Sequence, residues 1–371
     1  MYNKLNKKRL VLKNIVLIID NLVVGGAQTT NLGLAEAFLE KGYNVTLIVL
    51  KSLIDLDVNP AINLIELKYE KKYFSLLNRY IYANKLKNIL DSIKEENGEI
   101  NLILASLGLS HNLASMINTH KIHYVMHSSV KISQIDTKKN VSKFFKTRQL
   151  RKIYNNKNII CVSKGLEDDL LSLKIKPLSI QTIYNFFNFE HILNLSNAKL
   201  DYYFPNDYIV HVGRFSKDKR HDILIKAFHK IKNKDIKLVL VGDGAEKQNI
   251  NLLIEKLNLQ DRVILMGFQQ NPYPIIKKAK MLVLSSEHEG FGNVIVESLI
   301  LNTIVVSTDC PYGPYEILND NLSQCLVEMN DDISLSKVIN NILENPPEIK
   351  NSYINKFNRN EVIKEYKLLM N

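Results

Sequence analysis

The chain alternates short apolar runs with amphipathic stretches almost from end to end. This alternation is typical of βαβ units, in which crossover helices join buried parallel strands. A first series predicts strands near residues 14–19, 44–50, 101–105, 122–126 and 158–162. In the first crossover, the apolar residues of 32–39 form one helical stripe, and Gly42 ends it before the next strand.

A second series of the same kind begins at residue 208. Its strands are expected in YIVHVG (208–213), IKLVLVG (236–242), DRVILMG (261–267), KMLVLSS (280–286) and NTIVVST (302–308). Residues 185–207 lack a clear period and are the predicted linker. We therefore predict an α/β protein with two facing Rossmann-like domains, residues 1–186 and 187–355, and a cleft between them. In 356–371, Val362, Tyr366 and Leu369 predict a closing helix that packs back on the first domain.

Composition narrows the class of protein. A length of 371 residues suits two domains, and three cysteines without CxxC spacing argue for a reducing compartment and against a zinc site. The cysteine pattern therefore leads us to expect a cytoplasmic protein. No run reaches the ~18 apolar residues of a membrane-spanning helix, so any membrane role should be peripheral. The net charge of +11 indicates an anionic partner: nucleic acid, a phospholipid surface or a phosphate-bearing substrate.

The most informative stretch is SSEHEGFGNVIVESLI at 285–300. A buried strand ends there, a glycine-containing loop follows, and a helix is expected to begin near Asn293. Its free backbone N–H groups would form an anion site at the carboxyl edge of the sheet. Glu289 and Glu297 could both accept hydroxyls from a ligand over this helix, although a capping residue and a solvated residue would look the same.

Two further loops follow strands in the same way. In VGRFSKDKRHD (212–222), Arg214 and Lys219 could neutralise a diphosphate, although basic loops are more often solvated surface. Gly25 and Gly26 lie in GGAQ, which is not GxGxxG and lacks the acidic residue of a dinucleotide site. That difference argues against a dehydrogenase.

Taken together, EGFGNVIVE, GRFSKDK, the early GGAQ, GDG at 242–244 and the closing helix resemble a family 4 glycosyltransferase of the GT-B fold. The resemblance implies a retaining, metal-independent transfer of a sugar from a nucleotide sugar, with residues 1–186 on the acceptor side and 187–355 on the donor side. Arg214 and Lys219 would hold the diphosphate, Glu289 the donor-sugar hydroxyls, and Glu297 the ribose. The other implied donor-binding residues are Gly25, Gly26, Gly267, Phe268, Gly290, Phe291, Gly292 and Asn293.

Two further expectations concern the chemistry. His127 ends an apolar strand, where the family often has a histidine that contacts the sugar or acceptor; a structural histidine is the alternative. Two cations and a helix N-terminus already offset the charge of a leaving nucleoside diphosphate, so we expect no metal and no other cofactor. Asp55 and Asp57 imitate a metal-binding DxD, but we interpret them as a solvated loop.

Basic residues alternate with aromatic ones at 68–87 and again at 131–157, where Asp136 is the one acid. Such helices suit an anionic membrane surface, although a core helix with a solvated basic face fits each pattern equally well. We expect a UDP-sugar donor, a lipid-linked, lipopolysaccharide or capsule glycan acceptor, and peripheral attachment to the inner face of the plasma membrane.

Two alternative functions remain open. A GT-B sugar-nucleotide epimerase would share the fold without needing basic acceptor surfaces. A nucleic-acid-binding protein would explain the net charge, but the sequence has no helix-turn-helix, zinc or RNP signature, so we expect no nucleic-acid partner.

Overall fold

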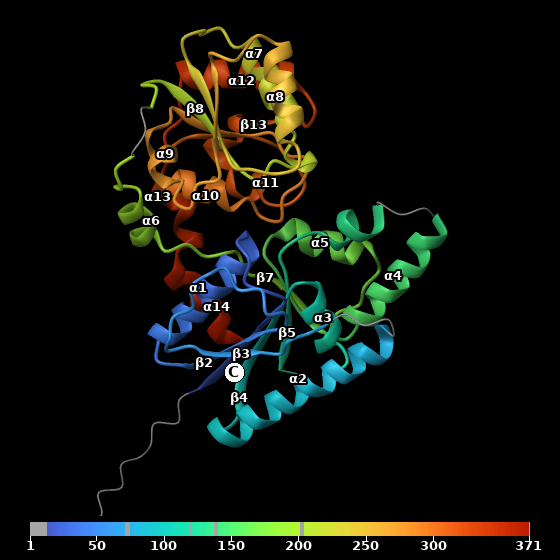
Figure 1. Ribbon diagram of the computed structural model, residues 1–371. Helices are drawn as coiled ribbons and strands as arrows, with labels where there is room; N and C mark the ends of the chain where they lie inside the picture. The colour runs from blue at the N-terminus through green and yellow to red at the C-terminus, as the bar shows by residue number, and fades with distance from the viewer. Residues whose placement is uncertain (1–12, 71–74, 119–120, 137–139, 201–203, 371) are drawn as a thin grey trace, which may run out of the picture. The chain divides into compact units, whose positions relative to one another are not determined.

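The computed structural model describes residues 13–70, 75–118, 121–136, 140–200 and 204–370 (Figure 1). The chain divides into two compact units. Unit 1 comprises Met1–Cys161, Leu170–Gln181 and Ile363–Asn371, and unit 2 comprises Val162–Asp169 and Thr182–Val362.

Unit 1 contains a seven-stranded sheet in the order β3-β2-β1-β4-β5-β6-β7. The central strand β1 is buried along its whole length and pairs in parallel with β2 and β4, which explains its unbroken apolar sequence. The strands are β1 (Asn14–Ile19), β2 (Asn44–Val49), β3 (Asn63–Glu66), β4 (Ile100–Ser106), β5 (Ile122–Met126), β6 (Asn158–Cys161) and β7 (Ser179–Thr182). The helices are α1 (Gly26–Glu40), α2 (Ser75–Asn97), α3 (Gly108–Ala114), η1 (Ile132–Asp136) and α4 (Asn140–Tyr154). The residues of α5 (Lys164–Ser172) and α14 (Arg359–Leu368) are divided between the two units.

Unit 2 contains a six-stranded sheet in the order β10-β9-β8-β11-β12-β13. The strands are β8 (Tyr208–Val212), β9 (Lys237–Val241), β10 (Val263–Gly267), β11 (Met281–Leu284), β12 (Val305–Thr308) and β13 (Leu326–Val327). The α-helices are α6 (Phe189–Leu195), α7 (His221–Lys230), α8 (Lys247–Lys256), α9 (Tyr273–Lys278), α10 (Asn293–Ile300), α11 (Pro314–Ile317), α12 (Asp332–Glu344) and α13 (Asn351–Ile354). The 3₁₀ turns are η2 (Lys217–Lys219), η3 (Asp320–Cys325) and η4 (Asn355–Phe357).

Each sheet reverses its strand order at one point, between β1 and β4 in unit 1 and between β8 and β11 in unit 2. Ligands of open α/β sheets bind outside the carboxyl ends of the strands at such a point, because the crossover helices leave in opposite directions there. The loops after β8 and β11 are those with GRFSKDK and EGFG. The topology therefore brings both sequence motifs to one edge of one sheet.

The predicted α/β fold with two Rossmann-like parallel-sheet domains is confirmed, and all ten predicted strands are present. Sequence reasoning missed β3, β7 and β13, which are short strands at or near the sheet edges. The expected linker region, 185–207, contains helix α6, which packs on α9 and α10. The closing helix is α14, and the ring of its Tyr366 lies 6.2 Å from the ring of Phe38 on α1, centroid to centroid.

Candidate functional site

The loops after β8 and β11 meet through an ion pair. Lys219 Nζ lies 2.6 Å from Glu289 Oε1, and the Ser286 hydroxyl donates to the same oxygen at 2.7 Å. The side chains of Lys219 and Glu289 are only 19% and 11% exposed, so water screens the pair weakly. The structure thus brings together two residues that the sequence separates by 70 positions, and it fixes the orientation of the Glu289 carboxylate.

Arg214 lies in the same loop as Lys219 but is exposed. Among the described residues, none pairs with its guanidinium group. A guanidinium in a loop at a sheet switch point can form bidentate hydrogen bonds with phosphate oxygens.

Helix α10 begins directly after this loop, as the sequence predicts. Gly292 precedes it with φ +88°, a left-handed conformation that favours glycine. Gly313, with φ +106°, packs against the loop so closely that a Cβ there would lie 1.8 Å from the carbonyl oxygen of Phe291. The Asn185 amide also donates to Asn293 Oδ1 at 2.8 Å. These contacts hold Phe291, Gly292 and Asn293 in place. The Ile295 N–H already donates to the Gly292 carbonyl oxygen at 2.9 Å, so the groups that an anion could use are the N–H groups of Asn293 and Val294.

Glu297 lies one turn further along α10 and is partly buried. Tyr273, at the start of α9, donates its hydroxyl to the Glu297 carboxylate, and burial raises the pKa of this carboxyl to about 7. Gly267 and Phe268 end β10 and begin the loop that leads to α9, and the Phe268 ring is exposed. Sequence reasoning missed Tyr273, because only the packing of α9 on α10 brings it to Glu297.

In unit 1, His127 follows β5 and belongs to a polar cluster. Its Nε2 lies 3.2 Å from Asn31 Nδ2 and 3.3 Å from Ser106 Oγ, and the Ser106 hydroxyl donates to Asn31 Oδ1 at 2.8 Å. Because an amide N–H faces Nε2, this nitrogen accepts, and the neutral ring carries its proton on Nδ1. Burial lowers the pKa of His127 to about 3. His127 is therefore suited to donate a neutral hydrogen bond, and its place beside Asn31 could not be read from the sequence.

Gly25 ends the loop after β1, and Gly26 is the first residue of α1. Gly25 has extended backbone, and a Cβ there would lie 2.7 Å from Gln28 Oε1. The Gln28 amide donates to Asn21 Oδ1 at 3.1 Å. The loop after β1 is therefore held by its own side chains at the switch point of the unit 1 sheet.

Asp55 and Asp57, in the sequence that imitates a metal-binding DxD, are exposed, as predicted for a solvated loop. Across the described ranges, no group of three or more His, Cys, Asp or Glu side chains is placed to hold a metal ion.

The basic segment 131–157 forms η1 and α4, apart from residues 137–139, which lie outside the described ranges. Val141, Phe144 and Phe145 are 73%, 65% and 62% exposed, whereas Leu150 and Ile153 are buried. The aromatic residues therefore point to solvent only in the N-terminal half of α4, which also carries Lys143, Lys146 and Arg148.

Part of the other basic segment, 71–74, lies outside the described residues, and with it the predicted contributions of Lys71, Lys72, Tyr73 and Phe74. The following helix α2 exposes Leu76, Leu77, Tyr80 and Ile81. In the part of the chain that the structure covers, no helix has the length and apolar character needed to cross a membrane.

Two family models match the chain in succession. Residues 24–191 match the model described as Glycosyltransferase Family 4, and residues 198–360 match the model described as Glycosyl transferases group 1.

Curated relatives point in the same direction. One is the N-acetylgalactosamine-N,N'-diacetylbacillosaminyl-diphospho-undecaprenol 4-alpha-N-acetylgalactosaminyltransferase of Campylobacter jejuni, 36% identical over 195 residues, which are 52% of this chain and 52% of the relative. Another is the lipopolysaccharide core biosynthesis glycosyltransferase LpsE of Rhizobium meliloti, 31% identical over 189 residues, with 51% and 54% covered. The matches span about half the length of these relatives.

Solved structures resemble nearly the whole chain. Anabaena HepE in complex with UDP and glucose has a TM-score of 0.74 at 16% identity, covering 96% of this chain and 98% of that one. The lipopolysaccharide outer core galactosyltransferase WaaB has a TM-score of 0.73 at 18% identity, covering 96% and 99%.

Proposed function

Because the chain belongs to the GT-B glycosyltransferases, with a Family 4 half followed by a group 1 half, we propose that it transfers a sugar from a nucleotide sugar to a glycan acceptor. The sugar is a hexose or N-acetylhexosamine, the nucleotide is UDP, and the transfer retains the anomeric configuration. The acceptor is a lipid-linked, lipopolysaccharide or capsule glycan.

One observation carries the proposal: the Lys219–Glu289 ion pair lies at a sheet switch point beside the N-terminus of α10. When the bond between the sugar C1 and the phosphate oxygen breaks, the departing UDP takes the electron pair and gains negative charge. Lys219 and the start of α10 are held in place before that charge develops, and Arg214 lies in the same loop as Lys219. A preorganised donor of this kind contributes about 3 kcal/mol to transition-state stabilisation.

The two glutamates receive different roles. Glu289 is held by Lys219 and Ser286, so we assign it to accept hydroxyls of the donor sugar rather than to attack C1. We assign Glu297 to accept the ribose hydroxyls, with Tyr273 orienting its carboxylate. We propose that no metal is needed, because Arg214 and Lys219 already supply two positive charges to the diphosphate.

Two observations support the acceptor class. The names of the Campylobacter and Rhizobium relatives specify a diphospho-undecaprenol-linked substrate and the lipopolysaccharide core. Helix α4 exposes aromatic residues among lysines and arginines, a composition that suits an anionic membrane surface. We therefore propose that the enzyme works peripherally on the inner face of the plasma membrane.

A donor-hydrolysis screen over UDP-, GDP- and ADP-sugars tests the proposal without a known acceptor. We expect slow release of UDP from one UDP-sugar, lost in Lys219→Ala and retained in Lys256→Ala, an exposed lysine of α8. Absence of hydrolysis across the panel would contradict the proposal. Conversion of a UDP-sugar into its epimer without nucleotide release would identify an epimerase instead.

A further inference from the structure

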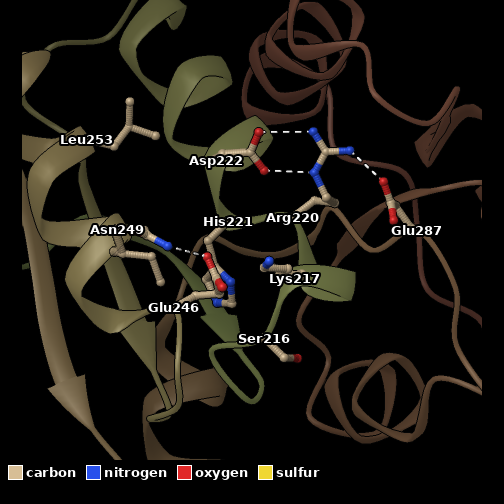
Figure 2. Close-up of a pocket in the computed structure, with 10 residues that line it drawn as sticks. Ser216, Lys217, Arg220, His221, Asp222, Glu246, Asn249, Leu253 and Glu287 are labelled. Atoms are coloured by element: carbon tan, nitrogen blue, oxygen red, sulfur yellow. Dashed lines mark hydrogen bonds and ion pairs between the residues drawn. The ribbon is translucent and has the colours of Figure 1, made fainter.

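A pocket lies next to the proposed donor site in unit 2 (Figure 2). It has a volume of about 410 Å³, in the range of small-molecule sites. Its walls come from the 216–222 segment, from α8, and from Glu287 in the loop after β11. None of the donor-site residues Arg214, Lys219, Glu289 and Glu297 lines it.

The pocket contains a buried polar side chain without a partner. His221 is 3% exposed, and neither of its ring nitrogens has a hydrogen-bond partner among the described residues. Its ring instead packs edge-on against the rings of His211 and Phe215, at 4.6 and 4.8 Å between centroids. Both ring nitrogens are covered by the surrounding side chains, so His221 contributes a neutral ring to the pocket lining, and the hydrogen bonds to a ligand must come from other residues.

The charges of the lining argue against an anionic ligand. Arg220 already makes a two-pronged contact with Asp222, at 2.8 and 3.0 Å, and a third hydrogen bond to Glu287 at 2.7 Å. Glu246 adds a third carboxylate, and Lys217 is the remaining cation of the lining. A phosphate group would therefore be repelled, because the lining has three carboxylates and only two cationic side chains. A cationic ligand would be repelled by Lys217 and Arg220.

The remaining lining groups suit a ligand rich in hydroxyls. The Asn249 amide donates to Glu246 Oε2 at 2.8 Å, which leaves the amide oxygen and the other carboxylate oxygen as acceptors. Ser216 adds a hydroxyl, and Leu253 adds an apolar wall. A sugar ring presents hydroxyls that both donate and accept, together with C–H groups that can pack on an aliphatic side chain.

We propose that this pocket is a subsite for one uncharged sugar residue, distinct from the donor site. The choice of ligand class rests on the proposed glycosyltransferase function, because a glycan substrate supplies such residues. The pocket would give the glycan a second point of attachment on unit 2.

Saturation-transfer NMR on the full-length protein tests the subsite directly. The probes are methyl α-glucoside, methyl α-galactoside and the N-acetylglucosamine disaccharide, each measured with and without saturating UDP. We expect transfer to at least one sugar to persist with UDP present. Asn249→Trp should fill the pocket and lower this transfer at least about tenfold. The matched control is Asn251→Trp, at an exposed position of α8 outside the lining.

Three outcomes would overturn the subsite: no transfer to any probe, complete displacement by UDP, or equal transfer in Asn249→Trp and the wild type. None of these requires catalysis, so the result is independent of the donor-hydrolysis screen.

Discussion

Arg220, in the loop after β8, donates from Nη1 to Glu287 Oε1, in the loop after β11, at 2.7 Å. Ser285 reinforces this connection, since its hydroxyl lies 2.8 and 2.9 Å from the carbonyl oxygens of Lys219 and Arg220. Two side chains thus join the loop that carries Lys219 to the loop that carries Glu289. The geometry of the donor site depends on residues that need not touch the donor.

The variant Arg220→Gly removes the side chain at this position while its backbone can keep the same conformation. Arg220 has φ +47°, which glycine adopts without strain, so the thermal stability should change little. The connection to Glu287 is lost, however, and UDP affinity should fall about tenfold, or about 1.4 kcal/mol. Calorimetric titration with UDP and thermal unfolding measure the two effects. An affinity equal to that of the wild type would show that Arg220 serves the fold alone.

Lys219→Ala and Arg214→Ala should each lower kcat by about two orders of magnitude, because each removes a charge that stabilises the leaving diphosphate. Arg214→Ala should leave the melting temperature unchanged, since the Arg214 side chain is exposed. Lys219→Ala also leaves Glu289 without its cation, so some loss of stability is expected. Unchanged turnover in both variants would refute the assignment of the diphosphate site.

The sequence predicts the strands and loops of this protein better than it predicts the side-chain partners. Continuous apolar runs identify the central strands, and glycines mark the loops that follow them. Edge strands such as β3, with sequence NLIE, bury too little surface to show a pattern. The pairing of Tyr273 with Glu297 and of His127 with Asn31 requires the packing of separate helices and strands, which no local pattern records.

Glu297 should make the stability of the free protein depend on pH. Its pKa rises from 4.5 to about 7 on folding, so the native state favours the protonated form. Stability should therefore fall as pH rises from 4.5 to 7, by at most about 3 kcal/mol. Glu297→Gln should remove this dependence and raise the melting temperature at pH 8.

The same variant should bind UDP more weakly at pH 8, because an amide is a poorer acceptor for ribose hydroxyls than a carboxylate. In the wild type, UDP affinity should rise as pH increases through 7. A variant that gains stability while keeping full UDP affinity would remove Glu297 from the ribose site.

Activity should persist in excess EDTA, because Arg214 and Lys219 balance the charge of the diphosphate. The first rate is measured in EDTA without added divalent ions, and the second after manganese is supplied in excess over EDTA. Complete loss in EDTA with recovery in manganese would refute the metal-independent mechanism.

The final prediction concerns membrane attachment through α4. Lys143, Lys146 and Arg148 accompany the exposed residues Phe144 and Phe145 in the N-terminal half of the helix. At about 1 kcal/mol for each basic residue near an anionic surface, replacing all three with Gln should lower vesicle binding about a hundredfold. Arg151 is left intact, because its Nε donates to the carbonyl oxygen of Leu173 at 2.9 Å and its loss would disturb the fold.

The matched control removes the same number of charges from exposed lysines of unit 2, by changing Lys256, Lys278 and Lys337 to Gln. Co-sedimentation with phosphatidylglycerol vesicles should separate the two triple variants at low salt, and the difference should shrink at physiological salt, where the Debye length is about 8 Å. Donor hydrolysis should be equal in both, since neither changes the donor site. If the α4 variant sediments as well as the control, or the wild type never sediments, the aromatic and basic residues of α4 are an ordinary solvated surface.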